Sequence, residues 1–218
     1  MPDVHVAALI GDFYHEPGPM RAALEAAVEG RGVTLDFFTD PLAMPWGGLA
    51  TYAALIVARE GRITPRESNA VWNTAAHERA IQDFVRAGGG LVGLHAGLAS
   101  YGHHGPYGST LHGSFFIHPE EHPEFRVRPT GTEHVLLEGF REVSFRDEMY
   151  FVRVDSAETA RLLEAVSPDY GSSTAAWAHS LGAGRVFCFT PGHRDEVLAD
   201  PAYRQFLARG IQWALGRL

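Results

Sequence analysis

Twelve histidines stand out in this chain of 218 residues, because imidazole can bind a metal or transfer a proton near neutral pH. Three of them, His15, His95 and His193, follow short apolar runs of the kind that form strands. Carboxylates follow such runs as well, among them Asp12 and Glu60. Imidazole together with carboxylate suits a divalent metal such as Zn, Mn, Fe or Ni. The sequence therefore predicts either a metal site or a metal-free pair of histidines that transfers protons.

The most specific local motif is Gly93-Leu94-His95-Ala96-Gly97, directly after a predicted strand. A glycine on each side of a central residue permits a sharp turn that holds its side chain above the sheet, as in a nucleophile elbow. Histidine at this corner could be a metal ligand or a general base, but it is a poor substitute for an acyl-forming thiol. The alternative is a tight turn in which His95 only makes hydrogen bonds.

The elements that must position these residues alternate between strands and helices. Continuous apolar runs predict buried strands at residues 4–10, 33–38, 52–58, 91–94 and 185–190. Helical spacing predicts helices at 19–28, from a cap at Asn73 or Thr74 to 87, and at 201–218. This order indicates one α/β domain over residues 1–218, doubly wound around a mostly parallel sheet. Ligands of such sheets bind at the carboxyl ends of the strands.

The rest of the chain is less regular. Shorter strands are predicted at residues 125–129, 145–154, 160–166 and 174–179. Residues 59–74 have no clear period and contain Pro65, which predicts a long loop. The segment 101–123, rich in Gly and His, is expected to be irregular.

Composition narrows the classes of partner and location. Asp and Glu outnumber Lys and Arg by 26 to 18, and no basic stripe is present, so nucleic acid is not an expected partner. No apolar stretch is long enough to span a membrane, and the first residues lack the basic start of a signal peptide, so we expect a cytoplasmic protein. The single cysteine, Cys188, excludes an intrachain disulfide framework, and its apolar neighbours predict a buried, inert thiol.

Four segments match motifs of one known family: 84–97 (FVRAGGGLVGLHAG), 113–119 (GSFFIHP), 147–150 (DEMY) and 178–216, which begins AHSLGAGRVFCFTPGHRDE. In these segments, which occur in the expected order over most of the chain, the sequence resembles the ThuA-like (trehalose-utilisation) family. The resemblance implies the class I glutamine amidotransferase-like fold, a flavodoxin-like three-layer sandwich.

In amidotransferases of this fold, a cysteine at the elbow works with a histidine and a glutamate that follow a late strand. The resemblance puts His95 in place of the cysteine and His193 in place of the histidine, with Glu196 as a loose counterpart of the glutamate. The missing cysteine implies that glutamine hydrolysis through a thioester is lost. Cys188 does not replace it, because it falls inside a predicted strand.

The candidate site residues have three expected roles. The catalytic candidates are His95, His193 and Glu148, although Glu148 or its neighbour Asp147 could instead pair with Arg146 or Arg153. The candidates for substrate binding are Asp12, Tyr14, Arg62 and Tyr150. A divalent metal would be held by loops distant in sequence, at His15, His95, His118 and His193, with Asp12 or Glu148.

The remaining histidines have simpler expected roles. His103 and His104 are expected in solvent, and the histidines at 5 and 179 within strands. Surface or capping positions are expected for His77, His112, His122 and His134.

The resemblance implies a role in the use of a carbohydrate, such as a disaccharide or a keto-sugar. An enzyme of this kind would be a hydrolase, lyase or isomerase with a histidine-rich pocket. The alternatives are a non-catalytic sugar-binding or regulatory protein on a degenerate amidotransferase fold, and a subunit that docks on a partner enzyme. The sequence does not decide whether the protein is a monomer or a homo-oligomer.

Overall fold

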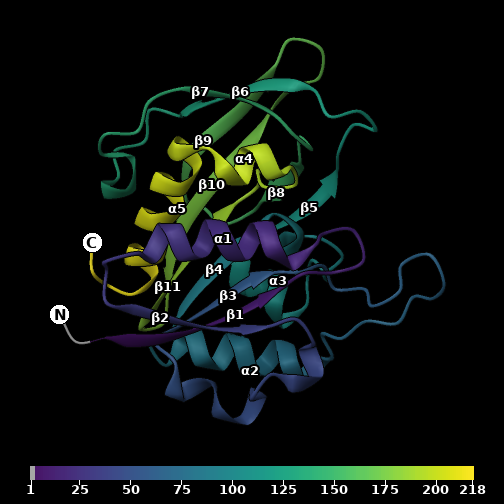
Figure 1. Ribbon diagram of the computed structural model, residues 1–218, viewed down its shortest axis with the longest axis vertical. Helices are drawn as coiled ribbons and strands as arrows, with labels where there is room; N and C mark the ends of the chain where they lie inside the picture. The colour runs from purple at the N-terminus through teal and green to yellow at the C-terminus, as the bar shows by residue number, and fades with distance from the viewer. Residues whose placement is uncertain (1–2) are drawn as a thin grey trace.

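Five adjacent parallel strands form one half of a nine-stranded sheet in the computed structural model, which describes residues 3–218 (Figure 1). Their order is β2 (Val33–Phe38), β1 (Val4–Ile10), β3 (Ala54–Ala58), β4 (Gly90–Leu94) and β11 (Gly184–Phe189). All five were predicted from apolar runs, and β3 begins at Ala54 instead of Tyr52. Their carboxyl ends meet at one edge of the sheet, where the predicted site residues follow.

Antiparallel strands continue the sheet beyond β11, in the order β10 (Gly171–Leu181), β9 (Ala160–Ser167), β6 (Glu124–Pro129) and β7 (Val143–Arg146). A separate pair consists of β5 (Gly113–Ile117) and β8 (Phe151–Val154). The doubly wound arrangement therefore describes the parallel half, and the DEMY segment links β7 of the antiparallel half to β8 of the separate pair.

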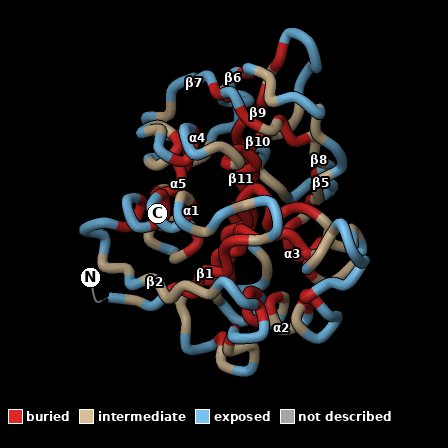
Figure 2. The backbone as a smooth tube through the Cα atoms, turned by 45° about the vertical axis from the view of Figure 1, so that its right-hand side comes forward, coloured by how far each residue is buried: buried red, intermediate tan, exposed pale blue. Residues whose placement is uncertain are grey.

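Helices cover both faces of the parallel strands, as predicted. One face packs against α1 (Pro17–Val28), α4 (Asp195–Ala199) and α5 (Pro201–Ala214), and the other packs against α2 (Ala75–Arg86) and α3 (Pro106–Leu111). Alternate side chains of β1 enter the two cores, with Val6 and Ala8 in the first and Leu9 in the second. Figure 2 shows this buried centre with exposed loops around it.

Several element predictions were wrong. Residues 145–154 do not form one strand: β7 and β8 belong to different sheets, because Asp147 turns away to accept hydrogen bonds from the loop after β11. The segment 101–123 contains α3 and β5. The last helix ends at Ala214, with Gly216 at φ +68° beyond it, and α4 was not predicted. The loop at 59–74 was predicted, with one bridge between Arg62 and Val71.

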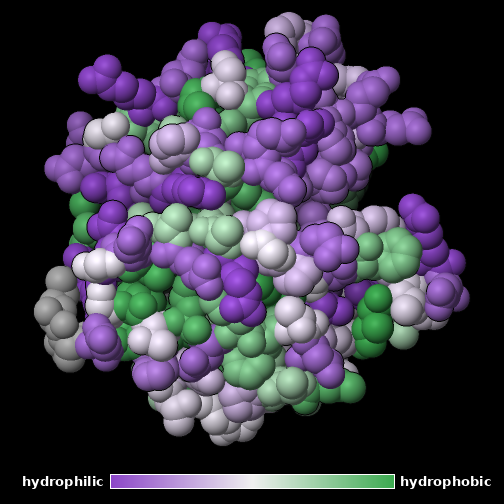
Figure 3. All heavy atoms as spheres, viewed as in Figure 1, coloured by the Kyte–Doolittle hydropathy of each residue, from purple (hydrophilic) through white to green (hydrophobic). Residues whose placement is uncertain are grey.

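The surface differs between the two halves of the molecule. In Figure 3 the face over β6, β7 and α4 is mostly hydrophilic, whereas hydrophobic residues gather over β1 and β2 below α1. β2 is an edge strand, and its apolar side chains are half-buried. Among residues 3–218, no helix has the length and apolar character needed to cross a bilayer.

Candidate functional site

The elbow predicted around His95 is present at the end of β4. His95 opens the short 3-10 helix η3 (His95–Leu98) with φ of 40°, in the left-handed region that non-glycine residues rarely adopt. A Cβ atom on Gly97 would lie 1.9 Å from the carbonyl oxygen of Val57 in β3, and one on Gly93 would lie 2.9 Å from Leu98 Cδ2. Close packing against backbone therefore requires Gly97, whereas a side chain at Gly93 would have to displace only the flexible end of Leu98.

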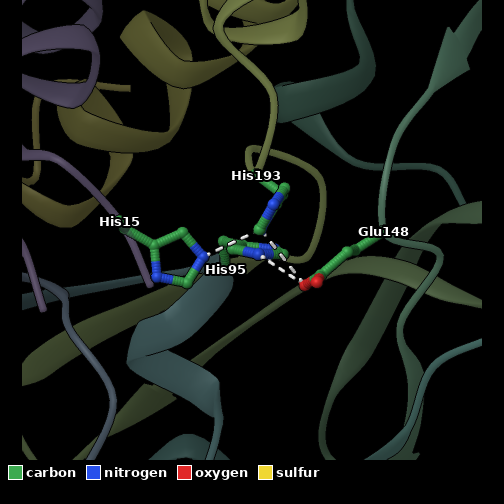
Figure 4. A group of neighbouring side chains, drawn as sticks. All are labelled: His15, His95, Glu148 and His193. Carbon is green, nitrogen blue, oxygen red and sulfur yellow. Dashed lines mark hydrogen bonds and ion pairs between the residues drawn. The ribbon is translucent and has the colours of Figure 1, made fainter. Parts of the chain in front are cut away.

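Four side chains from distant segments converge at this edge: His15, His95, Glu148 and His193 (Figure 4). One nitrogen or oxygen atom from each lies within 4.8 Å of the others. His15 Nε2 is 3.0 Å from His193 Nδ1, and Glu148 Oε2 is 3.3 Å from both His95 Nε2 and His193 Nδ1. The three histidines, 15, 95 and 193, follow β1, β4 and β11 in that order, and Glu148 lies between β7 and β8. The structure thus brings together all three predicted catalytic residues.

Outer hydrogen bonds fix the tautomers of two of these histidines. His95 Nδ1 is 2.8 Å from the carbonyl oxygen of Thr190, which can only accept, so Nδ1 carries the proton. The buried Nε2 of His95 then has a free lone pair, and it has no hydrogen-bond partner. His15 Nδ1 is likewise 2.7 Å from Asp12 Oδ1, which directs its Nε2 toward His193.

Burial and charge set the ionisation of the group. Burial lowers the pKa of His95, which favours the neutral ring. Burial opposes ionisation of Glu148, but the close contacts of its carboxylate with His193 and His95 outweigh it and hold the pKa of Glu148 well below its usual range. Burial also acts to lower the pKa of His193, and Glu148 outweighs it, so the pKa of His193 is raised. The site therefore combines a neutral His95 with an ionised carboxylate.

The fully buried Asp147 holds the loop that carries His193. Its carboxylate accepts hydrogen bonds from the backbone N–H groups of Gly192 at 2.6 Å, His193 at 3.2 Å and Arg194 at 2.9 Å. Of the two acidic residues in DEMY, Asp147 therefore positions the loop and Glu148 faces the site. The sequence left this division open.

The residues predicted to bind substrate surround the four convergent side chains, and each makes different contacts. Asp12 has no exposed side-chain surface and accepts hydrogen bonds from His15, from the backbone of Tyr14 and from that of Glu60. Tyr14 is 45% exposed. Arg62 donates to Glu60 Oε2 at 2.9 Å, in the loop after β3.

Tyr150 is buried, and its ring stacks on His95 with 4.2 Å between centroids. It therefore supports the His95 ring on one face.

Two further histidines meet the other oxygen of Glu148. His118 was predicted in the metal group, and its Nε2 lies 3.8 Å from Glu148 Oε1 instead of joining the other three histidines. His122, which was assigned to the surface or a cap, lies at the same distance from that oxygen. The repeated His-Pro pair in HPEEHP, residues 118–123, was the available signal for His122. Glu196 does not join the site, because it is exposed on α4 and pairs with Arg194.

A cavity of about 180 Å³ adjoins the four residues on the side of α1 and α4. Three of the four, His15, His95 and His193, line it together with Tyr14 and Asp195. Apolar side chains complete the wall, among them Met20 and Leu198. The site thus has a small chamber beside it that combines polar and apolar surface.

Comparison with known proteins agrees with the fold and motifs. A family model described as trehalose utilisation matches residues 5–214. The chain belongs to the ThuA family. Its match covers the strands and loops that supply all four convergent residues. No curated protein matches the sequence.

Solved structures share the fold of this chain at low identity. A putative ThuA-like protein from Bacteroides uniformis is 20% identical, with a TM-score of 0.77 over 98% of this chain and 91% of its own. A cytoplasmic protein from Salmonella typhimurium LT2 is 14% identical, with a TM-score of 0.71 over 96% and 99%. A β-galactosidase from Bacillus circulans is 12% identical, with a TM-score of 0.64 over 97% of this chain and 31% of that one.

Proposed function

We propose that this ThuA-family chain is an enzyme of carbohydrate utilisation whose site at the sheet edge holds a divalent metal ion next to a sugar. The observation that carries the proposal is the convergence of three imidazoles and one carboxylate within 4.8 Å. The Nε2 lone pairs of His95 and His15 point toward the other members of the group, and that of His95 has no hydrogen-bond partner. A cation or additional protons must offset such a concentration of acceptors, and burial disfavours a proton on His95.

The donor set fits a metal in spacing and protonation. Ligands about 2.0–2.2 Å from a tetrahedral Zn²⁺ lie roughly 3.3–3.5 Å apart, and three pairs of donor atoms here are 3.0 to 3.3 Å apart. Metal-bound histidines usually donate their second N–H to a carboxylate or carbonyl, as His15 does to Asp12 and His95 to Thr190. The set suits Zn, Fe, Ni or Mn.

The family description and the β-galactosidase neighbour support a carbohydrate as the substrate. A divalent metal polarises a carbonyl oxygen or lowers the pKa of bound water, which suits a hydrolase, lyase or isomerase acting on a keto-sugar. The 180 Å³ cavity is smaller than the roughly 300–1,000 Å³ of typical ligand pockets, so it suits a sugar ring or less. We propose that the fold is amidotransferase-like with the elbow nucleophile replaced by His95. A cytoplasmic location and a homo-oligomer stay predictions.

Metal content tests the site. Protein purified without chelators and then loaded with Zn, Mn, Fe or Ni should hold at least one ion per chain by elemental analysis. His95→Ala and His193→Ala should lose this ion while circular dichroism stays that of the folded protein. His77→Ala is the matched control, because His77 packs on Trp46 and bonds to Trp72 outside the site. Wild-type metal content in both site variants would overturn the metal proposal.

Turnover tests the enzyme. Metal-loaded and metal-free protein are incubated with trehalose and with its keto derivatives, and NMR follows the sugars. We expect conversion only with metal, and weaker metal binding as pH falls through about 6–7 and the imidazoles protonate. Sugar binding without conversion would favour the non-catalytic alternative. If the protein neither binds nor converts any of these sugars, the carbohydrate proposal is overturned.

A further inference from the structure

Tyr14 belongs both to the wall of the 180 Å³ cavity and to the outer surface of the protein. It lines the cavity together with the site histidines, and no other Phe, Tyr or Trp of the described chain does so. It is nevertheless 45% exposed, so its ring lies at the mouth of the cavity. Its loop follows β1 and projects at the carboxyl edge of the sheet, on the same side as the loop that follows β3 (Figure 1). A large aromatic surface exposed at a cavity mouth is typical of a ligand-binding site.

The ring of Tyr14 is held in place before any ligand binds. The backbone N–H of Asp12 donates to the carbonyl oxygen of His15 at 3.0 Å, and that of Tyr14 donates to Asp12 Oδ1 at 2.9 Å, which closes a tight turn. The Phe13 ring packs edge-on against the Tyr14 ring, with 5.0 Å between centroids. The guanidinium group of Arg66, from the loop after β3, lies 5.3 Å from the centroid of the Phe13 ring. A ring fixed in this way loses little conformational entropy when a ligand packs on it.

Two exposed carboxylates, those of Glu16 and Asp195, also belong to the cavity wall. Apart from the histidines, they are the acidic or basic side chains of the described wall, and no arginine or lysine is among them. Glu16 is the N-cap residue of α1, but its side chain makes no capping hydrogen bond. Within residues 3–218 neither carboxylate has an ion pair or a hydrogen bond. Free carboxylates accept hydrogen bonds from hydroxyl groups and repel phosphate and carboxylate groups, so this mouth favours an uncharged ligand rich in hydroxyl groups.

We propose that the cavity takes the terminal ring of an uncharged saccharide and that Tyr14 binds the next ring outside it. This inference rests on the proposed function, because it uses the cavity beside the site histidines as the sugar site. The volume of about 180 Å³ is below the roughly 300–1,000 Å³ of pockets that enclose a whole ligand, so a disaccharide does not fit inside. Its second ring must lie at the mouth, where Tyr14 is the aromatic surface. Tyr14 is therefore the residue that distinguishes a disaccharide from a monosaccharide.

A sugar ring has the two kinds of surface that this mouth can contact. Its C–H groups form apolar faces that pack on an aromatic ring, and its hydroxyl groups point outward from the rim. Tyr14 contacts an apolar face of the outer ring, while Glu16 and Asp195 accept hydrogen bonds from hydroxyl groups. A monosaccharide inside the cavity leaves the exposed part of the Tyr14 ring uncovered. Tyr14 therefore contributes more to the binding of a disaccharide.

Binding of two sugars of different length tests the role of Tyr14. The zinc-loaded full chain is titrated with trehalose and with glucose, and NMR measures both affinities. Tyr14→Ala should weaken the binding of trehalose by about 3- to 10-fold, the usual effect of losing an aromatic contact, and that of glucose by less than about 2-fold. Tyr14→Phe is the matched control, because it keeps the ring, and its affinities should stay within about 2-fold of wild type. The zinc content of each variant shows whether the neighbouring His15 is undisturbed.

Binding of a phosphorylated sugar tests the role of the carboxylates. Wild type should bind trehalose more tightly than trehalose 6-phosphate, and this preference should fall by up to about 5-fold in Glu16→Gln and in Asp195→Asn. The metal ion is present in every variant, so the change in preference measures the carboxylates alone. Glu196→Gln is the control, because Glu196 lies next to Asp195 on α4 but pairs with Arg194. Tighter binding of the phosphorylated sugar by wild type would overturn the assignment to an uncharged saccharide, as would an unchanged preference in both variants.

The outcomes separate this inference from the proposed function. No binding of either sugar by wild type overturns both together. Binding of both sugars, with equal losses in Tyr14→Ala or with no loss at all, overturns the role of Tyr14 alone and leaves the carbohydrate site in place. If Tyr14→Ala loses its zinc or its fold, Tyr14→Leu takes its place, because leucine keeps an apolar side chain without the ring. The same unequal loss is expected there, and equal losses would again overturn the role of Tyr14.

Discussion

The carboxylate of Asp147 accepts a hydrogen bond from the backbone N–H of His193, with 3.2 Å between Oδ1 and N. The residue after Asp147, Glu148, contacts the ring of the same histidine. Asp147 and Glu148 thus hold the main chain and the side chain of one loop residue. This arrangement makes the position of His193 depend on a residue that does not touch the site itself.

Asp147→Asn should weaken metal binding by about 10- to 100-fold, the usual effect of losing an outer support. Asparagine keeps only one side-chain oxygen, so its NH₂ group must face either the N–H of Gly192 or those of His193 and Arg194, and the hydrogen bonds on that side are lost. The unpartnered N–H groups should also cost about 1–3 kcal/mol of stability. Chelator competition and thermal melts measure both effects. Glu196→Gln, at an exposed position in the first turn of α4, is the control, and equal affinity in the two variants would contradict the role of Asp147.

Gly97→Ala should destabilise the protein by about 1–3 kcal/mol or more, because its Cβ would overlap the carbonyl oxygen of Val57 at 1.9 Å. That oxygen belongs to a central strand and cannot move aside as a flexible side chain could. Urea denaturation measures the change. Gly18→Ala in α1 is the control: nothing lies within 4 Å of the added atom, so stability should stay the same or rise slightly. A harmless Gly97→Ala would mean that the elbow does not need its glycine.

The parallel half of the fold could be predicted because its strands are buried on both faces and so appear as continuous apolar runs. The antiparallel half carries mixed patterns. In residues 145–154 the alternation continues through Asp147, and only the distant loop at 192–194 explains why the chain turns there. A short helix such as α4 has too few residues to give a periodic pattern.

The candidate site was predictable where a residue directly follows a strand. His15, His95 and His193 were found in this way, because parallel strands bring their carboxyl ends to one edge. Glu148 was found from the family motif DEMY and not from the strand pattern, since its position depends on the break between β7 and β8. His122 lies in a loop whose path follows from tertiary packing, and no property of the strand pattern places it at Glu148.

Glutamine should not be hydrolysed by this protein. The elbow presents His95, whose Nε2 faces Glu148, and no thiol stands at this corner to form a thioester. Ammonia release from glutamine, followed by a coupled dehydrogenase assay, should stay at the background rate. Ammonia release that disappears in His95→Ala or His193→Ala would contradict this expectation.

Cys188 should be inert in the native protein. It is fully buried in the core under α2, and burial raises the pKa of its thiol well above the usual value. A small thiol reagent should label it only after unfolding in guanidinium. Cys188→Ser should leave metal binding unchanged and cost about 1–3 kcal/mol, because the hydroxyl is buried among apolar side chains. Rapid labelling of the native protein would contradict its burial.

His179 should make the protein less stable in mild acid. Its Nε2 donates to the carbonyl oxygen of Thr110 at 2.9 Å, its Nδ1 is buried without a partner, and its ring stacks on His112 at 3.7 Å. Burial, and then the neighbouring His112, lower the pKa of His179 to about 4. The unfolded chain takes up this proton near pH 6.5, before the folded protein does. The free energy of unfolding therefore falls as pH drops from about 6.5 to about 4, by up to about 3 kcal/mol.

Replacing this histidine with an uncharged residue should remove that dependence. Urea denaturation of wild type and His179→Gln is compared at pH 8, where the ring is neutral in both states and the difference measures the packing cost alone. Between pH 6.5 and 4 the stability of the variant should fall less steeply than that of wild type. Since burial also lowers the pKa of His112, part of the slope should persist in His179→Gln and disappear in the double variant with His112→Gln. Equal slopes in wild type and the double variant would show that the stacked pair does not titrate on unfolding.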